Sequence, residues 1–375
     1  MVRNKRILLF LLLAIIIIFS ACTGQDSERF VPDAAGEQKI AGSSVIDHSE
    51  GVSEKVNDSE EPAEFGQTEA KEVMAKVKTD HEAPSTATFS LRVSQDYGAV
   101  TLKNEDVLLK PKMSVMDGLY YVYADEVETA FGGGYIKRIG SLRSELGGLS
   151  KPNQDWFFIV NGIFADIGAL DYYPQAGEKV WWDYHPWQAF QAANAVIGCY
   201  PEPFLHGYRG QTKATMILCR PEDQEFALQL EQALQAFGVK EIILKEISQE
   251  LLSKREGPTL VIGEWCELNK YAYLAELNQA FAKNGTFVHF TDHSLELLDY
   301  NGKKADEHCA GVGVIAASGE TAGDDSPLWI VSGTDKEGLR NALMLLVEQP
   351  DRVSGCFSAV ITSTHEVIRL PLMAR

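Results

Sequence analysis

The sequence lacks the patterns by which several classes of site are recognised. Its six cysteines form no Cys-x-x-Cys pair, so we expect neither a zinc site nor a disulfide framework. Neither Gly-x-Ser-x-Gly nor His-Glu-x-x-His occurs, and we expect no enzymatic activity and no cofactor. Basic residues are few: 34 Lys and Arg against 53 Asp and Glu give a net charge of −19. This excess of negative charge argues against nucleic acid as a partner, because phosphate binding needs a basic surface.

The N-terminus has the layout of an export signal. Arg3, Lys5 and Arg6 precede an unbroken apolar run, Ile7–Phe19, which is shorter than the roughly 20 residues of a membrane-spanning helix. Cys22 follows a small residue, and this arrangement resembles the lipobox of bacterial lipoproteins. The resemblance implies a signal peptide over residues 1–21 and lipidation of Cys22. The protein would then be anchored at the extracytoplasmic face of the cell membrane. An uncleaved N-terminal anchor is the alternative.

Residues 22–88 have the composition of a disordered linker. They hold 15 Asp and Glu against 6 Lys and Arg, so their net charge is 6 − 15 = −9. Aromatic residues are almost absent, and such a segment cannot bury enough apolar surface to offset its ordering entropy. We expect an acidic, self-repelling spacer between the anchor and the folded part.

Residues 89–187 predict a small α+β module. Phe89–Val93 alternate with period two, as in a half-buried strand. Ser114 and Asp117 form a weak capping box for a helix that we expect the glycine run 132–134 to end. Asn161-Gly162, between apolar runs, predicts a type I′ hairpin. Val180–Tyr184 then read as the last strand of a sheet over one helix.

These residues resemble the transcobalamin-like C-terminal domain family, a bacterial domain of the DUF4430 type. The matching elements, in order, are Val115–Leu119, Trp156–Val160, Asn161-Gly162, Gly168, Tyr172-Tyr173, Gly177–Lys179 and Val180–Tyr184. The resemblance implies a β-grasp-like fold. In vitamin B12 carriers this domain closes over one face of the corrinoid, so it implies a corrinoid (cobalamin) as a candidate ligand. A membrane transporter of an uptake system is the implied partner. The larger helical-barrel domain of the carriers has no counterpart here.

The last strand of the module suggests a binding surface. Neighbouring strand residues point to opposite faces, so Trp182 lies on one face and Trp181, Asp183 and His185 on the other. A tryptophan on the face away from the helix needs a cover: a flat ligand, a partner protein, or the C-terminal domain. For the first case the candidate ligand-binding residues are Phe164, Tyr172, Tyr173, Trp181, Asp183, His185 and Trp187. In the last case Trp181 and Trp187 form an internal seam. His185 could ligate a metal, or it could be structural or solvated.

Residues 196–375 alternate between strands and helices. Apolar runs at 215–219 and 328–332 precede helical patterns at 222–237 and 336–348, which predicts an α/β domain with a mostly parallel sheet. Its type is not recognised. Ligands bind at the carboxyl ends of such strands, where Glu264, Trp265, Gly333, Thr334 and Asp335 would lie. Ordinary turn chemistry, with Asp335 as a helix N-cap, is the alternative. His289, Asp292, His293, His308 and Cys309 suggest metal by composition but fit no zinc spacing, and 299–307 reads as a loop.

The sequence therefore supports two functions. The first is a surface-anchored lipoprotein that binds a ligand, with a corrinoid as candidate, for an uptake system. The alternative is a cell-surface structural or protein-interaction module with no small-molecule ligand.

Overall fold

The first strand of the protein, β1 (Thr88–Gln95), begins where the alternating pattern predicts. The computed structural model describes residues 86–147, 152–187 and 193–373. The predicted signal peptide, Cys22 and nearly all of the predicted linker lie outside these residues. The described residues belong to one compact unit, and none of their helices is long and apolar enough to cross a membrane.

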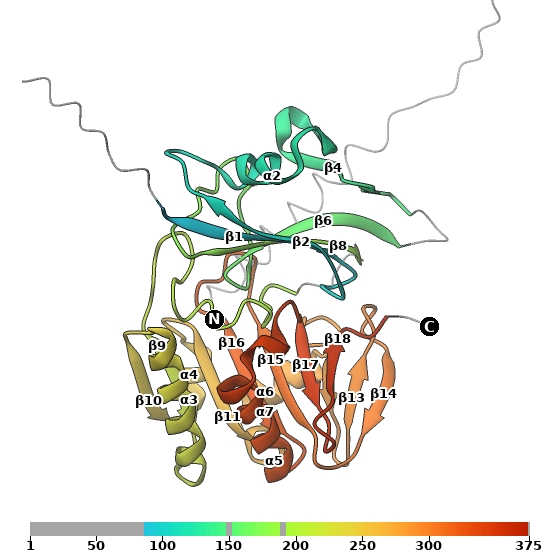
Figure 1. The fold of residues 1–375 in the computed structure, drawn as a ribbon. Coiled ribbons are helices and arrows are strands. Elements are labelled where there is room, and N and C mark those ends of the chain that lie inside the picture. Colours follow the sequence, from blue (N-terminus) through green and yellow to red (C-terminus); the bar gives the residue numbers. More distant parts are fainter. Residues whose placement is uncertain (1–85, 148–151, 188–192, 374–375) are drawn as a thin grey trace, which may run out of the picture. The chain divides into compact units, whose positions relative to one another are not determined.

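The N-terminal part is a five-stranded sheet with one helix, α2 (Val115–Tyr123), over one face (Figure 1). The strand order is β2-β1-β8-β6-β7. β1 and β8 are parallel, and the other neighbouring pairs are antiparallel. The further strands are β2 (Val100–Leu108), β6 (Asn153–Val160), β7 (Ile163–Phe164) and β8 (Lys179–Trp187).

The start of α2 is as predicted, but its end is not. Ser114 and Asp117 form the reciprocal capping box at the N-terminus. The helix ends at Tyr123, because Ala124 takes a positive φ of 48° and its N–H bonds back to Tyr120. The glycine run 132–134 therefore does not end the helix. It lies in the turn of a separate three-stranded sheet formed by β3 (Val127–Ala130), β4 (Tyr135–Ile139) and β5 (Leu142–Arg143).

The predicted Asn161-Gly162 hairpin is confirmed. It joins β6 to β7 with φ values of 52° and 80°, as a type I′ turn requires. The Asn161 side chain is buried and hydrogen-bonded on both sides: Nδ2 donates to Gly207 O over 2.8 Å, and Oδ1 accepts from Lys179 N over 2.8 Å. The turn thereby connects β8 to the segment that leads into the second sheet.

The C-terminal part is built on a seven-stranded sheet of order β10-β9-β11-β16-β15-β17-β18. The first four strands are parallel and the last three are antiparallel to their neighbours, so the sheet is mixed. Its strands are β9 (Thr215–Cys219), β10 (Ile242–Glu246), β11 (Thr259–Glu264), β15 (Gly313–Ser318), β16 (Leu328–Gly333), β17 (Ser358–Ile361) and β18 (Val367–Leu370). Its helices are α3 (Gln224–Phe237), α4 (Gln249–Ser253), α5 (Trp265–Leu268), α6 (Ala272–Gln279) and α7 (Lys336–Glu348).

A third small sheet corrects one prediction from sequence. β12 (Val288–Phe290), β13 (Leu295–Leu298) and β14 (Lys304–His308) pair antiparallel outside the main sheet. The segment 299–307, expected to be a loop, thus contains most of β14. Its sequence, KADEH, is almost wholly exposed and polar, so no apolar alternation marks it as a strand.

The buried apolar residues form three clusters. One lies between α2 and the five-stranded sheet and includes Leu119 and Trp182. A second joins α3 and α7 to one face of the seven-stranded sheet, with Trp329 inside it. The third combines the other face of that sheet with Trp181 and Ile159 of the N-terminal sheet. The two sheets therefore share one apolar seam.

Candidate functional site

The two faces of β8 are buried against different neighbours, as the alternation predicts. Trp182 lies in the core under α2, whereas Trp181 lies in the seam. Trp181 is 1% exposed, and its ring centroid is 5.3 Å from that of Phe357 in the C-terminal part. Of the three possible covers for Trp181, the structure has the C-terminal domain. Trp181 is thus an internal seam residue and not part of an open patch.

Polar contacts beside Trp181 also hold the two parts together along the seam. The Arg92 guanidinium lies 5.5 Å from the centroid of the Trp181 ring. Arg369 Nη2 donates to Gly98 O over 3.0 Å and also to Gly355 O. Gly98 has a φ of 77°, and a Cβ there would lie 2.0 Å from Gly355 O. The two parts approach too closely at this point for any side chain at position 98.

At the end of the seam lies a cavity of about 200 Å³, here called the seam pocket. Most of its walls are aromatic, and it draws on both the N-terminal and the C-terminal parts. Its lining residues are Tyr97, Phe157, Phe164, His185, Trp187, Ala193, Asn194, Phe287 and Tyr300. A cavity with mostly apolar walls and few polar groups is the usual form of a small-molecule site.

His185 is the titratable side chain with the most defined surroundings in the seam pocket. Its ring is stacked between Tyr97, at 4.3 Å between centroids, and Phe157, at 4.5 Å. The Phe357 ring meets it edge-on at 5.5 Å. Only 5% of the residue is exposed. Packing on both faces fixes the plane of the imidazole.

Asp183 orients that imidazole through a contact at its Nδ1 atom. Its carboxylate is fully buried, and Oδ2 lies within hydrogen-bonding distance of His185 Nδ1, at 2.8 Å. It also accepts from the backbone N–H of Tyr97 over 3.0 Å and of Gly98 over 2.9 Å, and from the Ser94 hydroxyl. Asp183 and His185 lie on one face of β8 because residues two apart on a strand point the same way.

The structure divides the predicted ligand-binding residues into three groups. Phe164, His185 and Trp187 line the seam pocket. Asp183 and Trp181 are buried beside it and support it. Tyr172 and Tyr173 lie elsewhere. Tyr172 is buried in the core under α2, where its hydroxyl donates to Glu178 over 3.1 Å, and Tyr173 is 52% exposed.

The sequence reasoning missed four aromatic residues of the pocket. Phe157 lies directly opposite Asp183 in the β6–β8 register, so strand pairing could have placed it on the same face. Tyr97 lies in the turn after β1 and carries a positive φ of 57°. Phe287 and Tyr300 are more than 100 residues away in sequence from His185, and no local pattern indicates that they approach it.

A loop of the C-terminal part, residues 319–326, holds one wall of the pocket. Gly323 N donates to Phe164 O over 2.7 Å, and Gly319 O accepts from Asn194 Nδ2 over 3.0 Å. Both Phe164 and Asn194 line the pocket. The loop therefore connects the seven-stranded sheet to the β7 edge of the N-terminal sheet.

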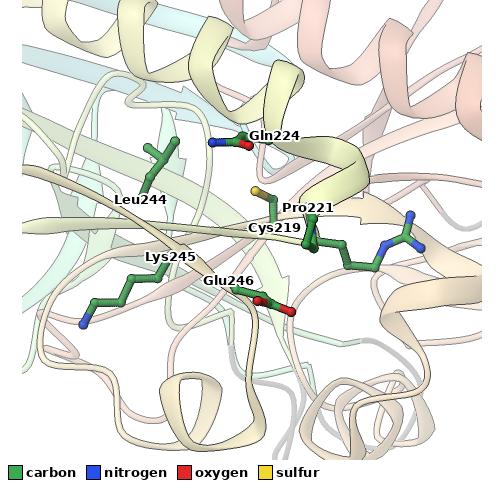
Figure 2. Close-up of a pocket in the computed structure, with 7 residues that line it drawn as sticks. Cys219, Pro221, Gln224, Leu244, Lys245 and Glu246 are labelled. Atoms are coloured by element: carbon green, nitrogen blue, oxygen red, sulfur yellow. The ribbon is translucent and has the colours of Figure 1, made fainter.

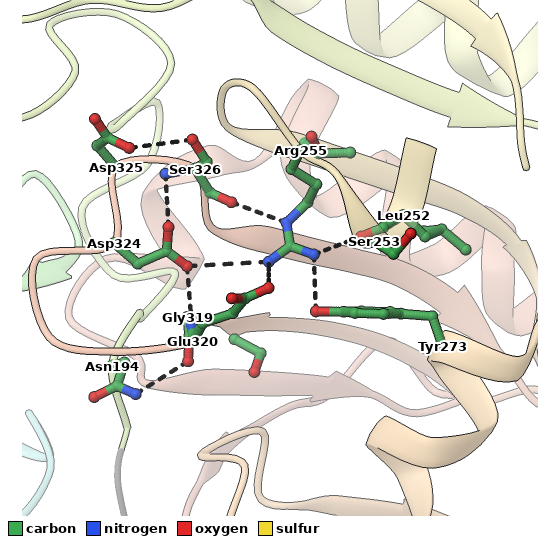
Figure 3. A network of polar contacts seen from close by, with 12 residues as sticks. Asn194, Leu252, Ser253, Arg255, Tyr273, Gly319, Glu320, Asp324, Asp325 and Ser326 are labelled. Atoms are coloured by element: carbon green, nitrogen blue, oxygen red, sulfur yellow. Dashed lines mark hydrogen bonds and ion pairs between the residues drawn. The ribbon is translucent and has the colours of Figure 1, made fainter. Parts of the chain in front are cut away.

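Arg255 fixes this loop from its other side (Figure 3). The guanidinium is 4% exposed. Its Nε donates to Ser326 O over 2.9 Å, and its Nη2 lies 3.3 Å from Glu320 Oε1. Nη1 donates to the Tyr273 hydroxyl over 2.8 Å. One buried cation thus joins the loop to α6.

A second cavity, of about 180 Å³, lies at the carboxyl ends of β9 and β10, where Figure 2 shows Cys219 beside Gln224 and Glu246. Arg220 lines it, but its guanidinium is already paired with Asp223 at 2.8 Å and Glu267 at 2.9 Å. These ion pairs connect the starts of α3 and α5, so the one guanidinium that lines this cavity already has partners within the protein.

A third cavity, of about 300 Å³, lies at the carboxyl ends of β11 and β16. It brings together Trp265 and Thr334, expected at that edge, with Asp292, His293 and Cys309. Asp335 is the N-cap of α7, as the alternative reading predicts: its side chain accepts from Gly338 N over 2.9 Å. Among the described residues, no group of three or more His, Cys, Asp or Glu side chains is arranged to hold a metal ion.

Comparison with known proteins gives one family. Residues 113–186 match the model of a family described as "Domain of unknown function (DUF4430)". The DUF4430-type family named from the sequence is thus confirmed over α2, β6, β7 and nearly all of β8, whereas β1 and β2 lie outside the matched residues. No curated protein matches the chain.

Proposed function

We propose that this chain is a surface-anchored binding protein that holds a small, flat ligand in the seam pocket. The makeup of the pocket carries this proposal: aromatic rings from the N-terminal and the C-terminal parts line a pocket with one imidazole that a buried carboxylate orients. Flat rings stack well between aromatic side chains, and one placed polar group gives such a site its specificity.

The N-terminal sequence supplies the location in this proposal. Lipidation of Cys22 would hold the protein at the extracytoplasmic face of the membrane, and the acidic residues 22–88 would act as a spacer. A membrane transporter that receives the ligand is the partner we propose.

A corrinoid is the ligand that the family resemblance suggests, and the α2-covered sheet supports the β-grasp-like fold implied by that resemblance. The pocket volume of about 200 Å³ limits how a corrinoid could bind. Pockets for drug-sized ligands span roughly 300–1,000 Å³. A macrocycle would therefore lie across the pocket mouth and insert only a peripheral group. A smaller flat molecule would fit inside.

One observation favours the alternative, a protein-interaction module without a ligand. Phe131 is 91% exposed at the turn between β3 and β4 and takes a positive φ of 51°, and Leu146 is 87% exposed. Large apolar side chains held in the open are typical of contact surfaces. If these exposed side chains carry the function, Phe131→Ser would abolish binding of the protein partner and leave small-molecule binding unchanged.

The test uses a variant that fills the pocket. Ala193 is half-buried and lines the seam pocket, so Ala193→Phe would occupy the space of a ligand, and Ala193→Ser is the matched control. Cyanocobalamin, indole and benzimidazole are titrated into the purified protein by calorimetry and ligand-observed NMR. We expect binding of at least one probe to the wild type and to Ala193→Ser, and none to Ala193→Phe. Binding that Ala193→Phe leaves unchanged would remove the pocket from the account.

A further inference from the structure

We infer that His185 presents a hydrogen-bond acceptor to the seam pocket, so that the site selects flat ligands carrying an N–H or O–H donor. The inference rests on the proposed function and defines the ligand class of the same pocket. A chain of hydrogen bonds runs from Trp181 through Ser94 and Asp183 to His185. The groups of this chain that can donate a hydrogen determine which nitrogen of His185 carries the proton.

The chain begins at Trp181. Its indole Nε1 has a hydrogen to donate and no lone pair to accept with, and it lies 2.6 Å from Ser94 Oγ. Ser94 Oγ therefore accepts from Trp181, and its own hydroxyl hydrogen is available for Asp183, the neighbouring carboxylate. The direction of this part of the chain is fixed by chemistry.

Asp183 then receives donors on both oxygens. Oδ1 accepts from Gly98 N–H over 2.9 Å and from the Ser94 hydroxyl, and Oδ2 accepts from Tyr97 N–H over 3.0 Å. The two backbone N–H groups cannot reverse their direction, and together with the Ser94 hydroxyl they favour the ionised carboxylate, which only accepts. The contact of 2.8 Å between Oδ2 and His185 Nδ1 is then made by a proton on Nδ1.

The form of His185 that binds such a ligand is the neutral imidazole, which with its proton on Nδ1 has a lone pair on Nε2. Tyr97 and Phe157 cover the two ring faces of His185, and Nδ1 is taken by Asp183. His185 lines the pocket, and Nε2 is the ring nitrogen that is left to face it. Nε2 makes no hydrogen bond to another described residue. A hydrogen-bond acceptor in an otherwise aromatic pocket increases the affinity for a ligand that donates a hydrogen bond to it.

The matched probes are indole and benzofuran, which have nearly the same shape and differ in an N–H donor against an oxygen acceptor. We expect the wild type to bind indole more tightly by roughly 2- to 12-fold, the effect of one net hydrogen bond. His185→Phe keeps a ring between Tyr97 and Phe157 and removes the lone pair, so it should bind both probes equally.

The outcomes separate this inference from the proposed function. If both probes bind the wild type equally and Ala193→Phe abolishes both, the pocket stands and the acceptor is wrong. If neither probe binds, the flat-ligand function itself fails for molecules of this size. A second measurement needs no variant: imidazole ¹⁵N NMR of the wild type should show a proton on Nδ1 and none on Nε2. A proton on Nε2 would overturn the inference.

Discussion

Nδ1 of His185 lies 2.8 Å from Oδ2 of Asp183, two residues earlier on the same face of β8. The carboxylate is fully buried, and the imidazole borders a cavity. This pair connects the seam, in which Trp181 is packed, to the seam pocket, where the N-terminal and the C-terminal parts both supply aromatic walls. It is the centre of the account proposed for this protein.

Asp183→Asn should be strongly destabilising. An amide places two N–H hydrogens among the backbone donors of Tyr97 and Gly98 and the ring of His185, so buried donors would face each other. We expect a loss of about 3 kcal/mol in the free energy of unfolding, measured with urea. Ser94→Ala removes one hydroxyl and should cost about 1 kcal/mol. Equal effects of the two variants would contradict this description of the carboxylate.

Gly98→Ala tests the closeness of the two sheets. The added Cβ would lie 2.0 Å from Gly355 O and 2.8 Å from the Trp181 ring, at a φ of 77°. Gly132→Ala is the control, because its φ is 70° and nothing lies within 4 Å of the added atom. The control should cost about 1 kcal/mol from backbone strain alone, and Gly98→Ala at least ~2 kcal/mol more. Similar thermal unfolding of the two variants would show that the seam can open without cost.

Arg255→Met should loosen the wall of the seam pocket. It removes the bonds to Ser326 O and the Tyr273 hydroxyl from a cation that is 4% exposed. We expect a loss of about 3 kcal/mol in unfolding free energy and weaker binding of any ligand of the pocket. Arg209→Met is the matched control, since the Arg209–Asp166 pair is half exposed and should be worth less than about 1 kcal/mol. Unchanged ligand affinity in Arg255→Met would show that the loop 319–326 does not determine the shape of the seam pocket.

Two side chains, His206 and Glu178, should contribute less to the stability of the protein as the pH rises. A hydrogen bond to Glu202 raises the pKa of His206, and burial raises the pKa of Glu178. A group with a raised pKa binds its proton more tightly in the folded state, so its contribution is complete below the ordinary pKa and is lost as the pH passes the raised value.

The losses should begin near pH 4.5 for Glu178 and near pH 6.5 for His206, their ordinary pKa values. Urea unfolding from pH 4 to 8 measures this. His206→Gln should flatten the curve only above about pH 6.5, and Glu178→Gln from about pH 4.5 upward. A variant curve that runs parallel to the wild-type curve would be inconsistent with the assignment for that side chain.

Two thiols should react in the folded protein. Cys266 and Cys309 are exposed, whereas Cys199, Cys219 and Cys356 are buried. Burial raises the pKa of Cys199 to about 11 and also raises those of Cys219 and Cys356, which leaves little thiolate at neutral pH. Brief iodoacetamide treatment followed by peptide mass spectrometry should find label on Cys266 and Cys309. Label on Cys199 would mean that the seam opens.

Local chemistry made part of the fold predictable. The Asn161-Gly162 turn, the Ser114–Asp117 capping box and the Asp335 cap each depend on residues within three positions of one another. Alternation along β8 likewise predicted that Trp181 and Trp182 face different ways. In these cases the physical cause lies wholly within the segment.

The rest depended on contacts between distant segments. Trp181 is covered by protein because Phe357, far away in the sequence, packs against it. Phe287 and Tyr300 complete the seam pocket, and their positions result from the packing of the C-terminal sheets. The mixed sheet was also hidden, because buried parallel and antiparallel strands such as β16 and β15 are equally apolar.

The most direct test is a crystal structure of the wild-type protein soaked with indole. We expect density for the ring between the aromatic walls of the seam pocket, with its nitrogen within hydrogen-bonding distance of His185 Nε2. Indole bound elsewhere, with the seam pocket left empty or closed by its own side chains, would contradict the claim that this pocket is the binding site.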